Sequence, residues 1–399
     1  MRTGGWWGGL ATGLALSTLG LAMAAQYDQL PSPSTLLTQT LARLDQYYVQ
    51  PVDNAALTDK ALSAMVSSLD RYSQYLRPDD IRSLEELADG HYDGLGLEVA
   101  FKDNKLLITQ PLPGSPAAVA GLKKGDEIVK IDGHPVAGAS LESLVKALRH
   151  GGKGQVELQV RRGEQLRHWT LSPGRVDVPS VSAQVLDGQR LWLRISQFQD
   201  STASEVRRSL QQYHPQLAIL DLRGNPGGVL QSAVAVADLF LDAGPIVSTQ
   251  GRSDEANHQY LAHSGDPFER LPLLVLLDKQ SASAAEILAG ALQDRHRALV
   301  LGQTSFGKGT VQTLIPLAGG QRALKITTAR YLTPSGRLID GTGIMPDVAA
   351  GTVLADARQR SLLKSHYPLT RAAEVAREGQ WADDALLWEA IKLTEKPSS

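Results

Sequence analysis

The order of apolar and polar positions divides the chain into three differently patterned stretches. Between residues 32 and 87, apolar side chains recur every three or four positions, with Pro51 and Pro78 as interruptions, which predicts helices. From about residue 89 to 171, short apolar runs alternate with glycine-containing turns, which predicts strands. From 190 to 348, buried strands alternate with helical segments. Such alternation is typical of an α/β core, so we expect an α/β multidomain protein.

Two strands of the predicted core end in segments that carry candidate chemistry. The strand Leu217–Leu220 is followed by the glycine-rich turn Asp221–Gly228, and the strand Leu273–Leu277 is followed by Ser281–Ile287. Functional sites of α/β proteins lie outside the carboxyl ends of such strands. Both segments therefore fall where a site is expected.

Ser283 fits both a structural and a catalytic role. The run Ser283–Glu286, before an apolar helical segment, is a capping-box signature, which alone favours a helix cap. A helix start is also where free N–H groups stabilise an oxyanion, and the two roles are compatible. As oxyanion donors we consider the N–H of Ala284 together with that of Gly227 or Gly228.

Lys308 is the candidate general base, although a lysine between glycines is more often a solvated turn residue. A base must be neutral, which requires lowering the lysine pKa from about 10.4 to near 7, a change of about 4–5 kcal/mol. Gly307 and Gly309 allow a close backbone approach that buries the amine. Gln312 lies four residues on in a predicted strand, and hence on the same face. Its neutral amide accepts a hydrogen bond from the amine without raising the pKa as a carboxylate would.

Composition excludes several classes of function. The 399 residues include no cysteine, so disulfides, thiolate nucleophiles and cysteine-based metal sites are excluded. The net charge of −2 and the absence of a basic block argue against binding nucleic acid. His258 and His263 lie in a polar stretch that we expect to be a loop, with the wrong separation for one helix face, so we expect no metal and no cofactor. A nucleotide-binding P-loop at Gly302–Lys308 is disfavoured because Gly309 replaces the serine or threonine that binds magnesium.

The N-terminus has the pattern of an export signal. Arg2 precedes an apolar run from Trp6 to about Leu21, and Ala22-Met23-Ala24 is a small-residue cleavage site. The same stretch is just long enough to serve as an uncleaved membrane anchor. We favour cleavage, and expect the mature protein in the periplasm, or on the extracytoplasmic side of the membrane if the signal is retained.

The strand-rich stretch resembles a PDZ domain of the bacterial-protease variety. The turn Gly121–Asp126 and the step Ile131–Gly133 carry the resemblance. It implies that the loop residues Gly94, Leu95, Gly96 and Leu97 present backbone N–H groups to the terminal carboxylate of a peptide, which is added as a strand. The alternative is that the two glycines merely make a turn.

Most of the chain, from about Leu36 to Val348, resembles the C-terminal processing peptidases, serine proteases that combine a PDZ domain with a Ser–Lys core. Besides the Ser281–Glu286 and Phe306–Gln312 segments, the runs Tyr331–Arg337 and Gly341–Asp347 carry this resemblance. It implies that Ser283 is the nucleophile, Lys308 the general base and Gln312 the residue that orients Lys308. The chain departs from the family at Ala285, where a serine is usual, and at Arg71-Tyr72, where a Pro-His pair is usual.

The same resemblance implies an order of domains and a set of partners. The domains are a signal peptide at 1–24, an N-terminal helical arm at 25–88, a PDZ domain at 89–174, the protease core at 175–349 and a C-terminal helical extension at 350–399. We expect an exported endopeptidase that recognises proteins or peptides with free C-termini, forms a homo-oligomer and accepts an adaptor or activator protein. The alternative is a PDZ adaptor whose protease core has lost activity, against which the intact Ser283, Lys308 and Gln312 argue.

Overall fold

The computed structural model describes residues 31–150, 154–186, 190–265, 268 and 270–350. The chain divides into two compact units, one ending at Arg71 and the other beginning at Tyr72. The expected export signal lies outside the described residues, as does the expected C-terminal helical extension beyond residue 350. Within the described part of the chain, no helix is both long enough and apolar enough to cross a bilayer.

The described part of the first unit contains two helices, α2 (Pro33–Tyr47) and α3 (Asn54–Ser67). Ser32 and Asp53 cap them by accepting hydrogen bonds from backbone N–H groups of the first turn. These helices agree with the predicted pattern. The helical prediction is wrong at β1 (Gln74–Leu76), which belongs to the second unit and precedes the helix α4 (Pro78–Asp89). These three residues are extended because they pair with a strand from the far end of the chain.

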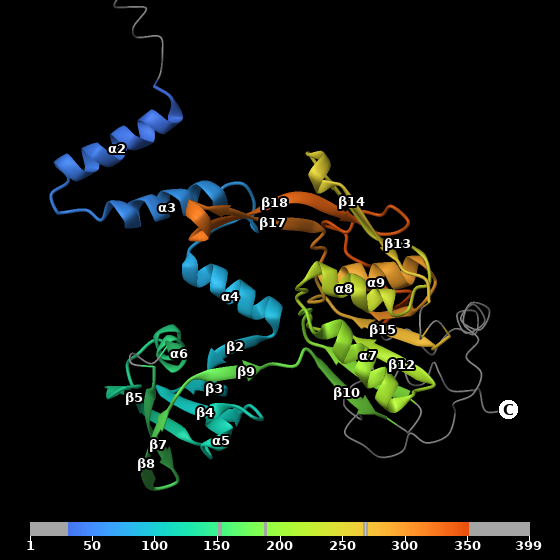
Figure 1. Ribbon diagram of the computed structural model, residues 1–399, viewed down its shortest axis with the longest axis horizontal. Helices are drawn as coiled ribbons and strands as arrows, with labels where there is room; N and C mark the ends of the chain where they lie inside the picture. The colour runs from blue at the N-terminus through green and yellow to red at the C-terminus, as the bar shows by residue number, and fades with distance from the viewer. Residues whose placement is uncertain (1–30, 151–153, 187–189, 266–267, 269, 351–399) are drawn as a thin grey trace, which may run out of the picture. The chain divides into compact units, whose positions relative to one another are not determined.

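The PDZ-like part is an antiparallel sheet with two helices (Figure 1). Its core is the apolar cluster around Leu106, Ile128 and Leu158. A two-stranded ribbon, β2 (His91–Gly94) with β9 (Gly174–Asp177), carries the chain in and out of it. The strands of the main sheet follow the order β3-β4-β5-β7-β8, with β6 beside β5. They are β3 (Leu97–Lys102), β4 (Lys105–Pro111), β5 (Glu127–Ile131), β6 (His134–Pro135), β7 (Val156–Arg162) and β8 (Gln165–Leu171). The two helices are α5 (Pro116–Val119) and α6 (Leu141–His150).

The predicted α/β core is present as a six-stranded sheet in the order β10-β11-β12-β15-β16-β19. All neighbours are parallel except β10 and β11. Every residue of β12 and β15 is buried, as the continuous apolar runs predict. The elements are β10 (Val181–Val185), β11 (Arg190–Ile195), α7 (Thr202–Tyr213), β12 (Leu217–Asp221), α8 (Leu230–Asp238), β15 (Leu273–Leu277), α9 (Ala284–Asp294), β16 (Leu299–Gly302) and β19 (Val348–Ala349).

A second sheet, in the order β1-β18-β13-β14 with β17 beside β18, adjoins this core. Besides β1, its strands are β13 (Gly244–Gly251), β14 (His258–Ala262), β17 (Thr310–Leu317) and β18 (Arg322–Leu332). The short helix η1 (Asp254–Ala256) lies between β13 and β14, and the short helix η2 (Ala318–Gly320) lies between β17 and β18. The expectation of a loop around His258 is wrong, because His258–Ala262 is the edge strand β14. Its polar residues follow from this edge position, where one side of the strand has no partner strand.

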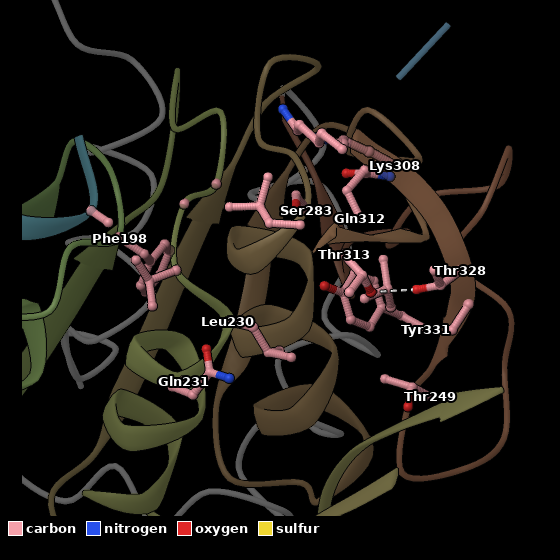
Figure 2. A pocket seen from close by; sticks show the side chains of 18 of the residues that line it. Phe198, Leu230, Gln231, Thr249, Ser283, Lys308, Gln312, Thr313, Thr328 and Tyr331 are labelled. Atoms are coloured by element: carbon pink, nitrogen blue, oxygen red, sulfur yellow. Dashed lines mark hydrogen bonds between the residues drawn. The ribbon is translucent and has the colours of Figure 1, made fainter. Parts of the chain in front are cut away.

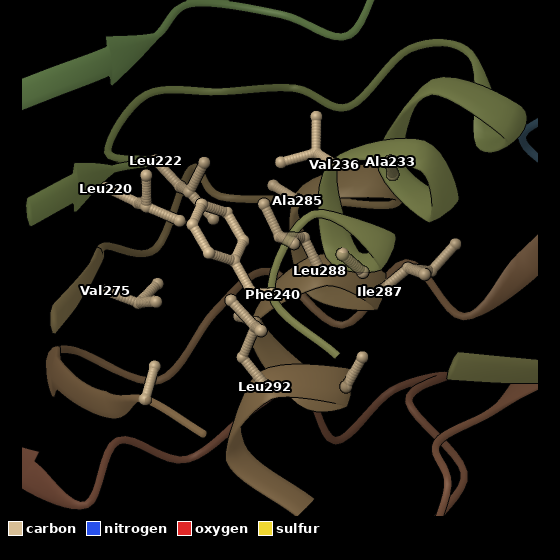
Figure 3. Close-up of a cluster of buried hydrophobic side chains, with 14 of the residues drawn as sticks. Leu220, Leu222, Ala233, Val236, Phe240, Val275, Ala285, Ile287, Leu288 and Leu292 are labelled. Carbon is tan, nitrogen blue, oxygen red and sulfur yellow. The ribbon is translucent and has the colours of Figure 1, made fainter. Parts of the chain in front are cut away.

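A cluster of buried apolar side chains fixes the segments that carry candidate chemistry. Figure 3 shows Phe240 among side chains from α8, α9, β12 and β15. Leu222, in the glycine-rich turn, and Ala285, in the first turn of α9, are fully buried members of this cluster. Because protein interiors are close-packed, these two anchors restrict how far the turn and the start of α9 can shift.

Candidate active site

Ser283 occupies the turn between β15 and α9 with an unusual backbone. Its φ of 56° and ψ of −115° are rare for a residue other than glycine and store on the order of 1–3 kcal/mol of strain. The side chain is half-buried and lines a pocket of about 740 Å³. Figure 2 shows Ser283, Lys308 and Gln312 together in this pocket. A strained turn that exposes a hydroxyl at a helix start is a suitable place for a nucleophile.

The glycine-rich turn lies directly against Ser283. A Cβ added to Gly227 would lie 2.7 Å from Ser283 Cβ and 3.0 Å from the Ala284 nitrogen, so only glycine permits this approach. Asn225, fully buried, ties the two segments together. Its side chain donates to the Ile195 carbonyl (2.8 Å), and its own carbonyl accepts from Ala282 N–H (2.9 Å).

The hydrogen bonds of this turn distinguish the two candidate oxyanion donors. The N–H of Gly227 already donates to Asn225 Oδ1 at 2.8 Å. Among the hydrogen bonds of the described residues, none uses the N–H of Gly228 or of Ala284. The pair of donors that remains for an oxyanion is therefore Ala284 with Gly228, not with Gly227.

Glu286 is a buried carboxylate that connects the serine and lysine segments. It is fully buried and accepts four hydrogen bonds, from Ser283 N–H (2.7 Å), Ser305 Oγ (2.6 Å), Gly307 N–H (2.7 Å) and Lys308 N–H (2.9 Å). Sequence reasoning assigned Glu286 only to the capping box. The signal available in the sequence was a charged residue inside an otherwise apolar helical run.

Lys308 is brought to the pocket by a loop, not by a strand. It precedes β17, whose first residue is Thr310, and the β17–β18 register shifts between Val311 and Gln312. Lys308 and Gln312 therefore do not share a strand face, contrary to the expectation from the sequence, although both line the same pocket. Gly309 is required for the course of this loop, because a Cβ there would lie 2.0 Å from the Asp340 nitrogen.

The Gln312 amide is fixed by two threonines. Its Nε2 donates to Thr310 Oγ1 at 2.9 Å and to Thr327 Oγ1 at 3.4 Å. These bonds use the amide hydrogens, so the carbonyl oxygen is left to accept a hydrogen bond. Such an acceptor suits an amine in the same pocket.

One wall of the pocket is apolar. Burial, with a further contribution from Tyr260, raises the pKa of the Tyr331 phenol well above its ordinary value, so this group stays neutral. An apolar, neutral wall suits the side chains of an extended peptide better than a charged ligand. The apolar wall is made by Phe198, Val229, Leu230, Val311, Ala329 and Tyr331.

Ser281 is placed as an internal anchor. It is fully buried, and its Oγ accepts from Asp278 N–H (2.9 Å) and lies 2.9 Å from the Leu222 carbonyl, to which it donates. The hydroxyl of Ser281 is thus engaged in hydrogen bonds within the protein. No group of acidic or histidine side chains within the described residues is arranged to hold a metal ion.

The expected peptide-binding loop is divided between two elements. Gly94 ends β2, Leu95 is buried in the PDZ-like core, and Leu97 begins β3. Gly96 has a φ of 71° and packs against Ser115. β3 is the edge strand of its sheet and pairs with β4 on one side. An edge of this kind can accept a peptide as a further strand.

Comparisons with known proteins identify the family of the chain. The model of peptidase family S41 matches residues 191–350, and a PDZ-domain model matches residues 107–162. A carboxy-terminal-processing protease of Bartonella bacilliformis is 38% identical over 375 residues, covering 88% of this chain and 86% of the relative. A "Probable CtpA-like serine protease" of Staphylococcus haemolyticus is 34% identical over 309 residues, which are 76% of this chain and 62% of that longer protein.

A solved structure, the photosystem II D1 C-terminal processing protease, is 28% identical, with a TM-score of 0.49 over 83% of this chain and 96% of that one. The matches define a serine peptidase with a PDZ domain. The chain belongs to peptidase family S41, and it is a carboxy-terminal-processing type of that family. The resemblance, the α/β multidomain fold class and the serine-peptidase class expected from the sequence are confirmed.

Proposed function

We propose that this peptidase hydrolyses peptide bonds with a Ser283–Lys308 dyad and selects its substrates by their free C-termini. The observation that carries the proposal is that Ser283, Lys308 and Gln312, from segments separate in the sequence, line one pocket with an apolar wall. The hydroxyl, the amine and the neutral amide are the groups that acyl transfer by a lysine-activated serine requires.

In the proposed reaction, the neutral Lys308 amine removes the proton from Ser283 Oγ as the oxygen attacks the scissile carbonyl. The N–H groups of Ala284 and Gly228 stabilise the oxyanion that forms. Lys308 then returns the proton to the leaving amine, which breaks the peptide bond and leaves an acyl-enzyme. Water, deprotonated by Lys308, hydrolyses the acyl-enzyme and restores Ser283. Gln312 holds the amine through its carbonyl oxygen.

The PDZ domain, in this proposal, captures the C-terminal end of the substrate. The loop formed by Gly94, Leu95, Gly96 and Leu97 is the candidate carboxylate site, and the open edge of β3 is the candidate surface for the added strand. We also propose that the protein is exported to the periplasm by its N-terminal signal. A homo-oligomer and an activating partner remain proposals of the same kind.

The test is cleavage of an unstructured polypeptide with an apolar C-terminal end by the purified protein. We expect Ser283→Ala to abolish cleavage and Lys308→Ala to lower kcat by about a thousandfold or more, because general-base catalysis contributes about 10²–10⁴. Binding of a C-terminal peptide should be unchanged in both variants. Lys279→Ala, which removes an exposed lysine near the same turn, is the matched control and should keep full activity.

A fully active Lys308→Ala protein would contradict the dyad. A parent protein that binds C-terminal peptides but cleaves nothing would instead favour an inactive adaptor.

A further inference from the structure

Tyr72 approaches Lys308 from a part of the chain far from it in sequence. The neighbouring residue, Ser73, is buried and accepts a hydrogen bond from Thr327 N–H at 3.2 Å. The next residues form β1, which pairs with β18 and places Gln74 opposite Lys325. β18 also pairs with β17, the strand that carries Gln312. Backbone pairing therefore fixes Tyr72 beside the hairpin that follows the candidate base.

The side chains of Tyr72 and Lys308 are in contact. Lys308 Nζ lies 5.0 Å from the centroid of the Tyr72 ring, within the range of a cation–π interaction. The attraction between the ring face and the amine depends on the positive charge, so it stabilises the protonated form over the neutral one. The contact thus acts against the deprotonation that a general base requires.

We propose that Tyr72 is a positioning residue for Lys308, whose ring holds the protonated side chain and sets the pH at which the amine becomes available to Ser283. The proposal rests on the proposed role of Lys308 as the base. When the ammonium gives its proton to water, the attraction to the ring falls, and the neutral amine is released toward the hydroxyl. The chain carries a tyrosine here in place of the histidine usual in the C-terminal processing peptidases that it resembles.

Other ionisable groups contact the lysine loop or line the same pocket. The Glu286 carboxylate accepts from the Lys308 backbone N–H, and Asp340 packs against Gly309. Lys325 of β18, Glu255 of η1 and His258 of β14 line the same pocket. All of these are unchanged in a variant of Tyr72, so a comparison of Tyr72 variants isolates the effect of the ring.

The experiment compares Tyr72→Leu, which removes the ring, with Tyr72→Phe, which keeps it and removes only the hydroxyl. We measure kcat/KM of the full chain against pH with an unstructured peptide. Since the neutral amine is the active form, loss of the ring should move the acid limb of the profile down by about 0.5–1 pH unit. Tyr72→Phe should keep the midpoint of the parent protein, and KM should change little in either variant.

A second measurement reads the amine without using catalysis. In the Ser283→Ala background, the pH dependence of acetylation of Lys308 by acetic anhydride is quantified by mass spectrometry. We expect its midpoint to fall in Tyr72→Leu and not in Tyr72→Phe. Equal acetylation midpoints in all three proteins, or an equal shift in Tyr72→Phe, would each overturn the proposal.

The two measurements separate this inference from the proposed function. If the acetylation midpoint moves with the ring while the pH–rate profile does not, Tyr72 controls the Lys308 amine but Lys308 is not the base. In that case the role of Tyr72 as the holder of the ammonium stands, and the dyad is rejected.

Discussion

A single carboxylate, that of Glu286, holds backbone N–H groups from both the serine turn and the lysine loop. The strained backbone of Ser283 has to be maintained by its surroundings, and the 2.7 Å bond to its N–H is the most direct restraint on it. The same carboxylate also fixes the backbone of the lysine loop, because it accepts hydrogen bonds from the N–H groups of Gly307 and Lys308. Glu286 thus positions both members of the proposed dyad without touching the substrate.

Glu286→Gln should lower kcat by about ten- to a hundredfold while KM changes little. The glutamine amide brings two hydrogens to a place where every neighbour donates, so at least one buried donor is left unpaired, at about 1–3 kcal/mol. Steady-state kinetics and thermal unfolding of the same preparations measure the two effects.

Glu205→Gln is the matched control. The Glu205 carboxylate also accepts backbone N–H bonds, from Ser180 and Val181 at 3.0 Å each, but it does not line the pocket. This variant should lose stability and keep kcat. If both variants lose kcat equally, the effect of Glu286 is one of general stability and not of positioning.

The sequence indicated Ser283 and Lys308 as candidate residues but not the contacts that join their segments. The capping-box spacing pointed to Glu286 and the start of α9 because those contacts are local. The bonds from Gly307 and Lys308 to Glu286, and the approach of Tyr72, arise only when segments distant in sequence meet. The local spacing of residues along the sequence does not show which distant segments come into contact.

At the level of elements, the buried strands were the most predictable. β15 has the predicted bounds, Leu273–Leu277, because a continuous apolar run flanked by polar turns has one simple interpretation. The strands β1 and β14 were missed because each is short or polar and lies at an edge, so its structure depends on a distant partner. The bulge between Val311 and Gln312 was missed for the same reason.

Within the PDZ-like part, Asp126 links the start of β5 to the end of β7. It is buried, receives two hydrogen bonds of 2.7 Å from Arg162 and accepts from Lys123 N–H. Burial alone would raise the pKa of Asp126, but the bonds from Arg162 and Lys123 outweigh it and hold the pKa below its ordinary value. The ionised form is therefore the one that stabilises the fold.

Asp126→Asn should destabilise the PDZ-like part by about 2 kcal/mol at neutral pH. A depressed folded-state pKa contributes stability above the unfolded value of about 3.9 and loses it as the pH falls through the folded-state pKa. The difference between parent and variant should thus be constant from about pH 5 to 8 and shrink toward acid. Urea unfolding at several pH values measures it. A difference that grows on acidification would contradict the assignment.

On the scale of the whole molecule, recognition and cleavage are assigned to different domains. The open edge of β3 belongs to the PDZ domain, and Ser283 belongs to the α/β core. In the proposed function, the substrate must therefore reach the core, while its C-terminal end is selected by the PDZ domain. The separation predicts that blocking the terminal carboxylate affects binding more than chemistry.

A peptide substrate with an amidated C-terminus should show a KM higher than that of the free acid by about tenfold or more, with a similar kcat. The carboxylate accepts charge-assisted bonds that a neutral amide does not replace, and each contributes about 1.5–3 kcal/mol. Kinetics on matched acid and amide peptides measure the difference. Gly96→Val, which would force a side chain onto Ser115, should remove the difference in KM between the acid and amide peptides. Equal KM values for both peptides in the parent protein would reject selection by the C-terminal carboxylate.

The hydrogen bonds made by the Asn225 side chain also depend on the chemical stability of its amide over time. Asparagine side chains deamidate over time when the nitrogen of the following residue attacks the amide and closes a five-membered imide. The residue after Asn225 is Pro226, whose ring nitrogen carries no hydrogen and cannot close that imide. Pro226 therefore protects the Asn225 amide from deamidation by this route. The hydrogen bonds of this amide to Ile195 and Gly227 are thereby preserved in a protein that persists for a long time.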